Sequence, residues 1–223
     1  MLFDHKLTPE QLEQIKKSLK LLSQTLDKGI DGFGPLQSAE SLGEKFLANP
    51  AYETKMEKIQ ALARWEIRKN FSTGFLTSLG GILTLPLAIP ASLAASWILQ
   101  IRMVAAMAHI AGFNITDPPV KTSIAICLLG NKAKDLLDAD LSQIEAMLRK
   151  QGNTAGFSKQ SLQVINQALA SALIRMATEK GFTRVGKAIP LLGGVAGGLL
   201  DYLSAKESAN FAIELFDMER TLT

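Results

Sequence analysis

Residues 71–101 read FSTGFLTSLGGILTLPLAIPASLAASWILQI and contain no charged side chain. A run of about 20 apolar residues is long enough to cross a bilayer as one helix. Here Pro86 and Pro90 interrupt the run, so one arm ends at Leu85 and the second runs from Pro90 to the residue before Arg102. Each arm is too short to span a membrane, and the stretch therefore predicts a hydrophobic helical hairpin bent at LPLAIP. The hairpin is expected either in a protein core or in one leaflet of a bilayer.

The remainder of the chain predicts further helices and no confident strand. The first begins at a capping box, Thr8-Pro9-Glu10-Gln11, and is expected to end at Gly29. Its apolar residues recur at helical spacing and require a partner helix. They are Leu12, Ile15, Leu19, Leu22 and Leu26. Caps and glycines predict further helices over 41–48, 52–70, 90–112, 117–130, 140–152, 158–181 and 193 to about 219.

Composition supports this fold class. Hydrophobic residues make up 47% of the chain and aromatic residues only 6%, so the apolar content is mostly Leu, Ala and Ile, which favour helices. The sequence predicts an all-α domain of several helices around a central hydrophobic hairpin. Within it, residues 1–50 are expected to form an N-terminal helical arm and residues 51–223 the main domain. The N-terminus, MLFDHKLTPEQ, lacks a secretory signal, and the expected setting is cytoplasmic.

Charge is distributed unevenly along the chain. The net charge of +3 is too small to imply a nucleic-acid partner. Over 149–187, seven Lys and Arg residues oppose Glu179 alone, giving 7 − 1 = +6, whereas 188–223 carries two cations and five carboxylates, giving 2 − 5 = −3. A basic stretch beside apolar sequence attracts anionic lipid headgroups. The alternative for this stretch is a solvated helix face.

The residues that most enzymes use are scarce. The chain has two histidines, His5 and His109, and one cysteine, Cys127, which excludes an internal disulfide and a Cys-based zinc site. No G-x-S-x-G motif supplies a serine nucleophile. GFTRVGK at 181–187 has the spacing of a phosphate-binding loop, but Ala188 stands where Ser or Thr is needed, and a helical pattern precedes it. No metal, cofactor or nucleotide is expected.

Charges within apolar sequence are the main site candidates. Arg102 follows the hairpin and Asp201 follows the glycine-rich run GGVAGG, so both need a partner or access to water. We expect Arg102 and Asp201 to form an ion pair, with Arg64, Arg68 and Lys187 as further members of one polar cluster. A structural ion pair is favoured over catalysis here. The glycine run is expected to pack closely against the small residues of the second hairpin arm.

Four runs of the chain resemble the EcsC family. They are GFLTSLGGILTLPLAIPASLAASWILQIRMVAAMAHIAGFNITDP, LLGNKAKDLL, VINQALASALI and VGKAIPLLGGVAGGLLDYLSAKESANFAIELF. The resemblance covers about residues 60–216 and rests on the order and spacing of the runs. It departs from the family at Ser92, where an aspartate is frequent. The family is named for a member encoded beside an ABC transporter linked to protein secretion, and the resemblance implies no defined catalytic activity.

These observations lead to three functional hypotheses. The first is a membrane-associated accessory protein that lies peripherally on the membrane and binds lipid or a membrane protein such as an ABC transporter. Its contact candidates are Leu85, Pro86, Ile89, Trp97, Arg184 and Lys187.

The second hypothesis is a soluble hydrolase for a lipid-like substrate, with its pocket between the hairpin and the glycine-rich helix. Its candidate residues are Arg102, His109, Lys187 and Asp201. The third is a soluble helical module whose N-terminal leucine stripe binds a partner helix.

Overall fold

The computed structural model describes residues 9–72, 91–135, 142, 144–146, 162–173, 193–216 and 218. Its named elements are α1 (Pro9–Asp31), α2 (Ala39–Leu47), α3 (Lys55–Ser72), α5 (Ala91–Ala111), α6 (Pro118–Ile126), the 3₁₀ turn η1 (Cys127–Leu129) and α9 (Gly193–Leu215). Residues 162–173 are also helical. Within these residues, β pairing is limited to one isolated bridge between Phe33 and Leu36. The predicted all-α class is confirmed.

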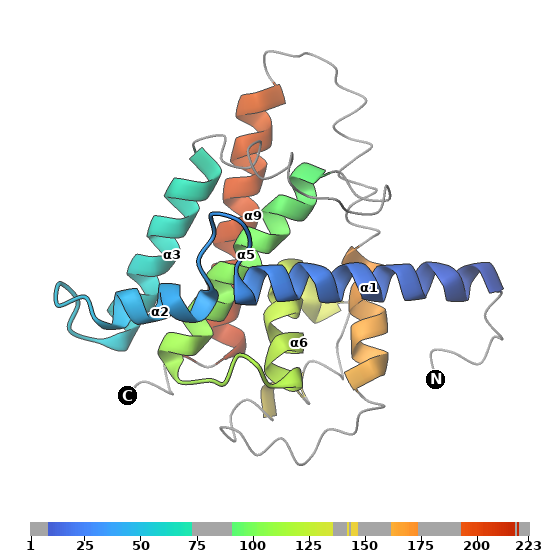
Figure 1. The fold of residues 1–223 in the computed structure, drawn as a ribbon, viewed down its shortest axis with the longest axis horizontal. Helices are drawn as coiled ribbons and strands as arrows, with labels where there is room; N and C mark the ends of the chain where they lie inside the picture. Colours follow the sequence, from blue (N-terminus) through green and yellow to red (C-terminus); the bar gives the residue numbers. More distant parts are fainter. Residues whose placement is uncertain are drawn as a thin grey trace.

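Helix α5, the second arm of the predicted hairpin, lies at the centre of the fold. Every side chain over 93–108 is buried, and α1, α2, α3 and α9 all pack against this helix (Figure 1). A helix that is apolar on all sides must be covered on all sides, which is why this one takes the central place. The first arm and the LPLAIP bend lie outside the described residues.

The length of α5 raises the question of a membrane span. The segment Leu93–Ala111 is the one stretch among the described helices that is long and apolar enough to cross a bilayer, with mean hydropathy 1.4. In the fold, 94% of the most apolar 18-residue stretch of this segment is buried by the protein itself. A core helix has this same composition, so the burial accounts for its hydropathy without a bilayer.

Helix α1 runs across α5 and α6 (Figure 1). The prediction that Gly29 ends this helix is wrong: α1 continues to Asp31, and Gly32 ends it with φ of 89°. Gly29 serves packing instead, because a Cβ atom there would lie 2.4 Å from Cγ2 of Ile101 on α5. Of the leucine stripe, Leu22 and Leu26 belong to the core and Leu19 packs against it. The division into an arm (1–50) and a domain (51–223) stays a prediction.

Hydrogen bonds cap the starts of α2 and α3, and one further hydrogen bond joins the two helices. Ser38 Oγ accepts a hydrogen bond from the Ser41 amide at the start of α2. Helix α3 begins with a capping box in which the Glu57 amide donates to Thr54 Oγ1 and the Glu57 carboxylate accepts from the Thr54 amide. Lys58 Nζ donates to the Leu47 carbonyl at 2.6 Å, which satisfies the C-terminal end of α2.

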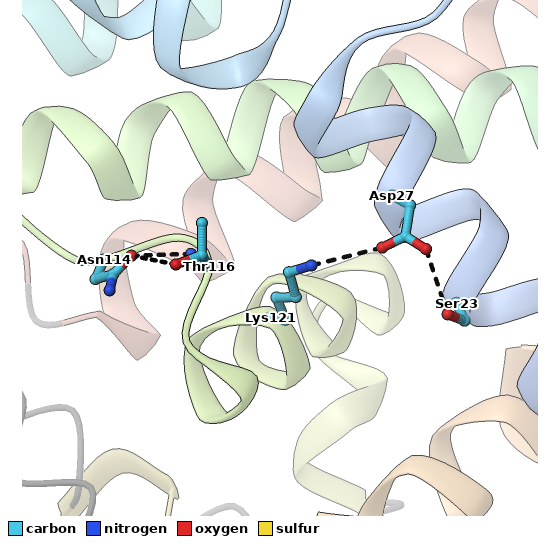
Figure 2. Close-up of polar contacts among 5 residues, drawn as sticks. All are labelled: Ser23, Asp27, Asn114, Thr116 and Lys121. Atoms are coloured by element: carbon cyan, nitrogen blue, oxygen red, sulfur yellow. Dashed lines mark hydrogen bonds and ion pairs between the residues drawn. The ribbon is translucent and has the colours of Figure 1, made fainter.

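The end of α5 and the start of α6 follow the sequence signals. Gly112 ends α5 with φ of 100° and Gly130 follows η1 with φ of 55°, both as predicted. Figure 2 shows Lys121 on α6 extending toward Asp27 on α1, with Nζ 3.5 Å from Oδ1. This pair is largely exposed and contributes little to stability. It lies at the edge of a groove of about 320 Å³ between α1, α6 and the 162–173 helix.

Candidate functional site

The Arg102 side chain is buried and paired, as a charge inside a protein must be, but its partner is Glu66. Nη2 of Arg102 on α5 lies 2.8 and 2.6 Å from the two carboxylate oxygens of Glu66 on α3. The side chains are 5% and 0% exposed. The prediction that Arg102 is paired is therefore confirmed, but the predicted partner, Asp201, is wrong.

Asp201 belongs to a second polar chain, on the α9 side of α5. Ser96 Oγ donates to Asp201 Oδ1 at 3.5 Å, and Gln100 Nε2 donates to Ser96 Oγ at 3.1 Å. Ser208 Oγ on α9 donates to Gln100 Oε1 at 2.7 Å. Ser96, Gln100 and Ser208 are buried, so these bonds satisfy groups that would otherwise be costly to desolvate. This series of hydrogen bonds fixes the register of α9 on α5.

Glu66 was missed at the sequence level, although its position in the helix carries a signal. The buried face of α3 follows the helical period, and Glu66 stands within it. Its residues are Ile59, Leu62, Ala63, Glu66 and Ile67. A carboxylate in the middle of an apolar stripe requires a buried cation. Arg102, the only cation in the apolar sequence of α5, supplies it.

The opposite side of α3 is cationic and aromatic. Together with Lys45 of α2, this surface is called the Trp65 face; its residues are Lys45, Arg64, Trp65, Arg68 and Lys69, all exposed. Nζ of Lys69 lies 4.3 Å and Nζ of Lys45 5.6 Å from the centre of the Trp65 ring, both in cation–π geometry. Phe46 of α2 packs edge-on against Trp65 with ring centres 6.1 Å apart. The predicted cluster members Arg64 and Arg68 thus lie on this outer surface, away from the buried face of α3 that holds Glu66.

A pocket of about 450 Å³ opens on this face. Its lining residues are Tyr52, Ala61, Arg64, Trp65, Arg68 and Lys69. Three of these carry a positive charge and none carries a carboxylate. Arg68 and Lys69 also make other contacts. The pocket combines a concave shape, an aromatic wall and cations, which suits an anionic ligand.

The other described candidates lie apart from this pocket. His109, near the end of α5, is half-buried, and its Nε2 lies 2.7 Å from Oε1 of Glu44 on α2. Trp97 is 5% exposed and belongs to the core. Arg102, His109 and Asp201, the described candidates for hydrolysis, each have a different partner and do not line the described pockets. In the part of the chain that the structure describes, no three His, Cys, Asp or Glu side chains are grouped to hold a metal.

Cys127 is a buried thiol in η1. Its Sγ donates to the Ser123 carbonyl at 3.3 Å, and burial raises the pKa of the thiol far above its usual value. Such a thiol is neither nucleophilic nor a metal ligand in the folded state. Its place in the core agrees with its apolar sequence context.

Several predicted contact residues lie outside the described residues. They are Leu85, Pro86, Ile89, Arg184 and Lys187. Comparisons with protein-family models, with curated proteins and with solved structures give no match to this chain. The resemblance to the EcsC family thus rests on the sequence runs quoted above.

Proposed function

We propose that this protein is a membrane-associated accessory protein of the EcsC type, and that its Trp65 face binds anionic membrane surfaces. The observation that carries the proposal is the exposed Trp65 ring, which Lys45 and Lys69 both contact, with Arg64 and Arg68 beside it on α3. Tryptophan is enriched at the membrane interface, where its apolar ring and its N–H group meet different environments. Lysine stems lie along such apolar surface while their charges reach the headgroups.

Electrostatics gives the expected strength of this interaction. Each Lys or Arg near an anionic bilayer contributes about 1 kcal/mol, so about 4 kcal/mol at low salt is the upper limit for the four cations of the Trp65 face, two of which also make other contacts. The only carboxylate in the second half of α3 is that of Glu66, which is buried against Arg102. In the second half of α3, the fold therefore presents the basic side chains to solvent and keeps the acidic one inside.

The proposal assigns membrane contact to a folded surface. Helix α5 is covered by other helices, which supports a role in holding the fold together. The resemblance to a family named for a transporter-associated member supports a cytoplasmic protein that works beside a membrane partner. No described pocket gathers the candidates for the hydrolase alternative, so no second function is proposed.

Co-sedimentation with vesicles tests the proposal. The wild type is expected to pellet with vesicles of phosphatidylcholine plus phosphatidylglycerol at low salt, and to stay in the supernatant with phosphatidylcholine alone or at high salt. The double variant Arg64→Glu, Arg68→Glu loses two favourable charges, so its affinity is expected to fall by roughly 30-fold or more. Far-UV circular dichroism checks that it is folded.

A matched control reverses the same number of charges elsewhere. Lys16 and Lys20 are exposed on α1, and the variant Lys16→Glu, Lys20→Glu changes the net charge of the protein by the same amount. It is expected to retain most of the binding. Equal losses in the two double variants would show that net charge, and not the Trp65 face, determines binding. Absence of wild-type binding to either vesicle would refute the proposal.

A further inference from the structure

The pocket on the Trp65 face has a narrower chemistry than a general basic surface. Arg64 and Arg68 are one helical turn apart on the same side of α3, so their side chains are neighbours and both line the pocket. Lys69 adds a third cation, and Tyr52 brings a phenol to the same lining from the segment before α3. These groups surround one concavity of about 450 Å³, a size in the range of small-ligand sites.

We propose that this pocket binds a phosphomonoester, presented by the headgroup of an anionic lipid or by a soluble phosphate ester. The lipid form of the proposal rests on the proposed function. A guanidinium group offers N–H donors in a planar fork that matches two phosphate oxygens, and the fork of Arg64 beside the charges of Arg68 and Lys69 suits an anion with three terminal oxygens. A phosphomonoester has those three oxygens and a charge of about −1.5 to −2 near neutral pH. A phosphodiester has only two free oxygens and a single charge.

Local contacts hold the walls of the pocket. Phe46 fixes one edge of Trp65, and Lys69 lies over its ring. The loop that carries Tyr52 is ordered on both sides, because the Ala51 amide donates to Asn49 Oδ1 and the Glu53 amide donates to Glu57 Oε2. A site whose walls are fixed before binding loses less conformational entropy when the ligand enters. Selectivity for one headgroup therefore has a structural basis.

The experiment compares headgroups at equal surface charge. Vesicles containing phosphatidic acid and vesicles containing phosphatidylserine are matched in zeta potential, and binding of the wild type is measured on both. The soluble arm titrates glycerol 3-phosphate, a monoester, and glycerophosphocholine, a diester, by calorimetry. The wild type is expected to bind phosphatidic acid vesicles about tenfold more tightly than phosphatidylserine vesicles, and glycerol 3-phosphate about tenfold more tightly than glycerophosphocholine, which is the effect of about one charge-assisted hydrogen bond.

The variant Arg64→Lys keeps the positive charge but removes the planar guanidinium group with its paired N–H donors. It is expected to bind phosphatidylserine vesicles as the wild type does and to lose the tenfold preference for the monoester. Lys20→Arg on α1 exchanges the same two side-chain types in the other direction outside the pocket, and it is expected to leave both affinities unchanged.

The outcomes separate this inference from the proposed function. Equal wild-type binding to both vesicle types at matched potential, with no response to glycerol 3-phosphate, overturns the phosphomonoester site and leaves the membrane proposal intact. Binding of glycerol 3-phosphate that Arg64→Lys weakens, without binding to vesicles, supports the site for a soluble ester and overturns the membrane proposal. A monoester preference that survives in Arg64→Lys overturns the assignment to this pocket.

Discussion

Replacement of Glu66 by Gln tests the buried ion pair that joins α3 to α5. Both Glu66 oxygens accept from Arg102 Nη2, at 2.8 and 2.6 Å, and neither side chain is more than 5% exposed. Arg102 Nε is also buried, and it has no hydrogen-bond partner among the residues that the structure describes. The carboxylate is therefore the group that balances the Arg102 charge in the described surroundings. Because Arg102 is only 4% exposed, its guanidinium has little contact with water once that charge is removed.

Removing one partner of a buried pair costs about 3–5 kcal/mol. A protein of this kind has a total stability of about 5–15 kcal/mol, so Glu66→Gln is expected to shift the urea midpoint strongly or to prevent folding at room temperature. Urea titration followed by far-UV circular dichroism gives the free energy of unfolding of each variant. Glu44→Gln is the matched control, since that carboxylate is 62% exposed beside His109. Its cost is expected to stay below about 1 kcal/mol.

The double variant Glu66→Leu, Arg102→Met keeps the test informative if Glu66→Gln does not fold. It removes both charges and fills the space with apolar atoms, so it is expected to be more stable than Glu66→Gln and close to the wild type. A loss below about 1 kcal/mol in Glu66→Gln would refute the reasoning, because it would mean that Arg102 finds water or another partner. A double variant no more stable than Glu66→Gln would equally contradict it.

Three further predictions concern the contacts of α5 and the core. Gly29→Ala places a Cβ 2.4 Å from the Ile101 side chain and is expected to lower the free energy of unfolding by at least about 1–3 kcal/mol, which is measured as a lowered melting temperature. An unchanged melting temperature would mean that α1 moves freely on α5. Ser208→Ala leaves buried Gln100 Oε1 without its 2.7 Å donor and is expected to cost about 1–3 kcal/mol in urea unfolding, against no loss if water replaces the hydroxyl. Because burial raises its pKa, the Cys127 thiol should react with a thiol reagent only at the rate of unfolding; rapid labelling of the native protein would contradict this burial.

The sequence predicted the helical class, the central helix and most helix ends for identifiable reasons. Glycines at positive φ, Gly112 and Gly130, leave a clear local signal, because other residues rarely adopt that conformation. Gly29 was wrongly predicted to end a helix. In the sequence, a glycine that ends a helix looks the same as a glycine inside a helix that lets a neighbouring side chain approach closely. Its partner, Ile101, is distant in sequence.

The candidate site was predictable only in part. Arg64 and Arg68 were singled out, but as members of one polar cluster with Arg102, and the structure places them on the exposed side of α3 while Arg102 is buried. Helix periodicity shows which residues share a face, but it does not say which face is covered. The Trp65 face escaped notice because Lys45 comes from a different helix, and such a surface forms only after α2 and α3 dock.

The inward position of Glu66 has a consequence for how the basic surface depends on folding. Arg64, Arg68 and Lys69 give the second half of α3 a charge of +3 in the folded protein, while the −1 of Glu66 is cancelled inside by Arg102. If α3 separates from α5, that carboxylate returns to solvent among the three cations and the local charge falls to 3 − 1 = +2. The undocked helix is then attracted less strongly to an anionic surface than the docked helix is. An anionic membrane would accordingly favour the docked state of α3, and lipid binding would stabilise the helical core beneath it.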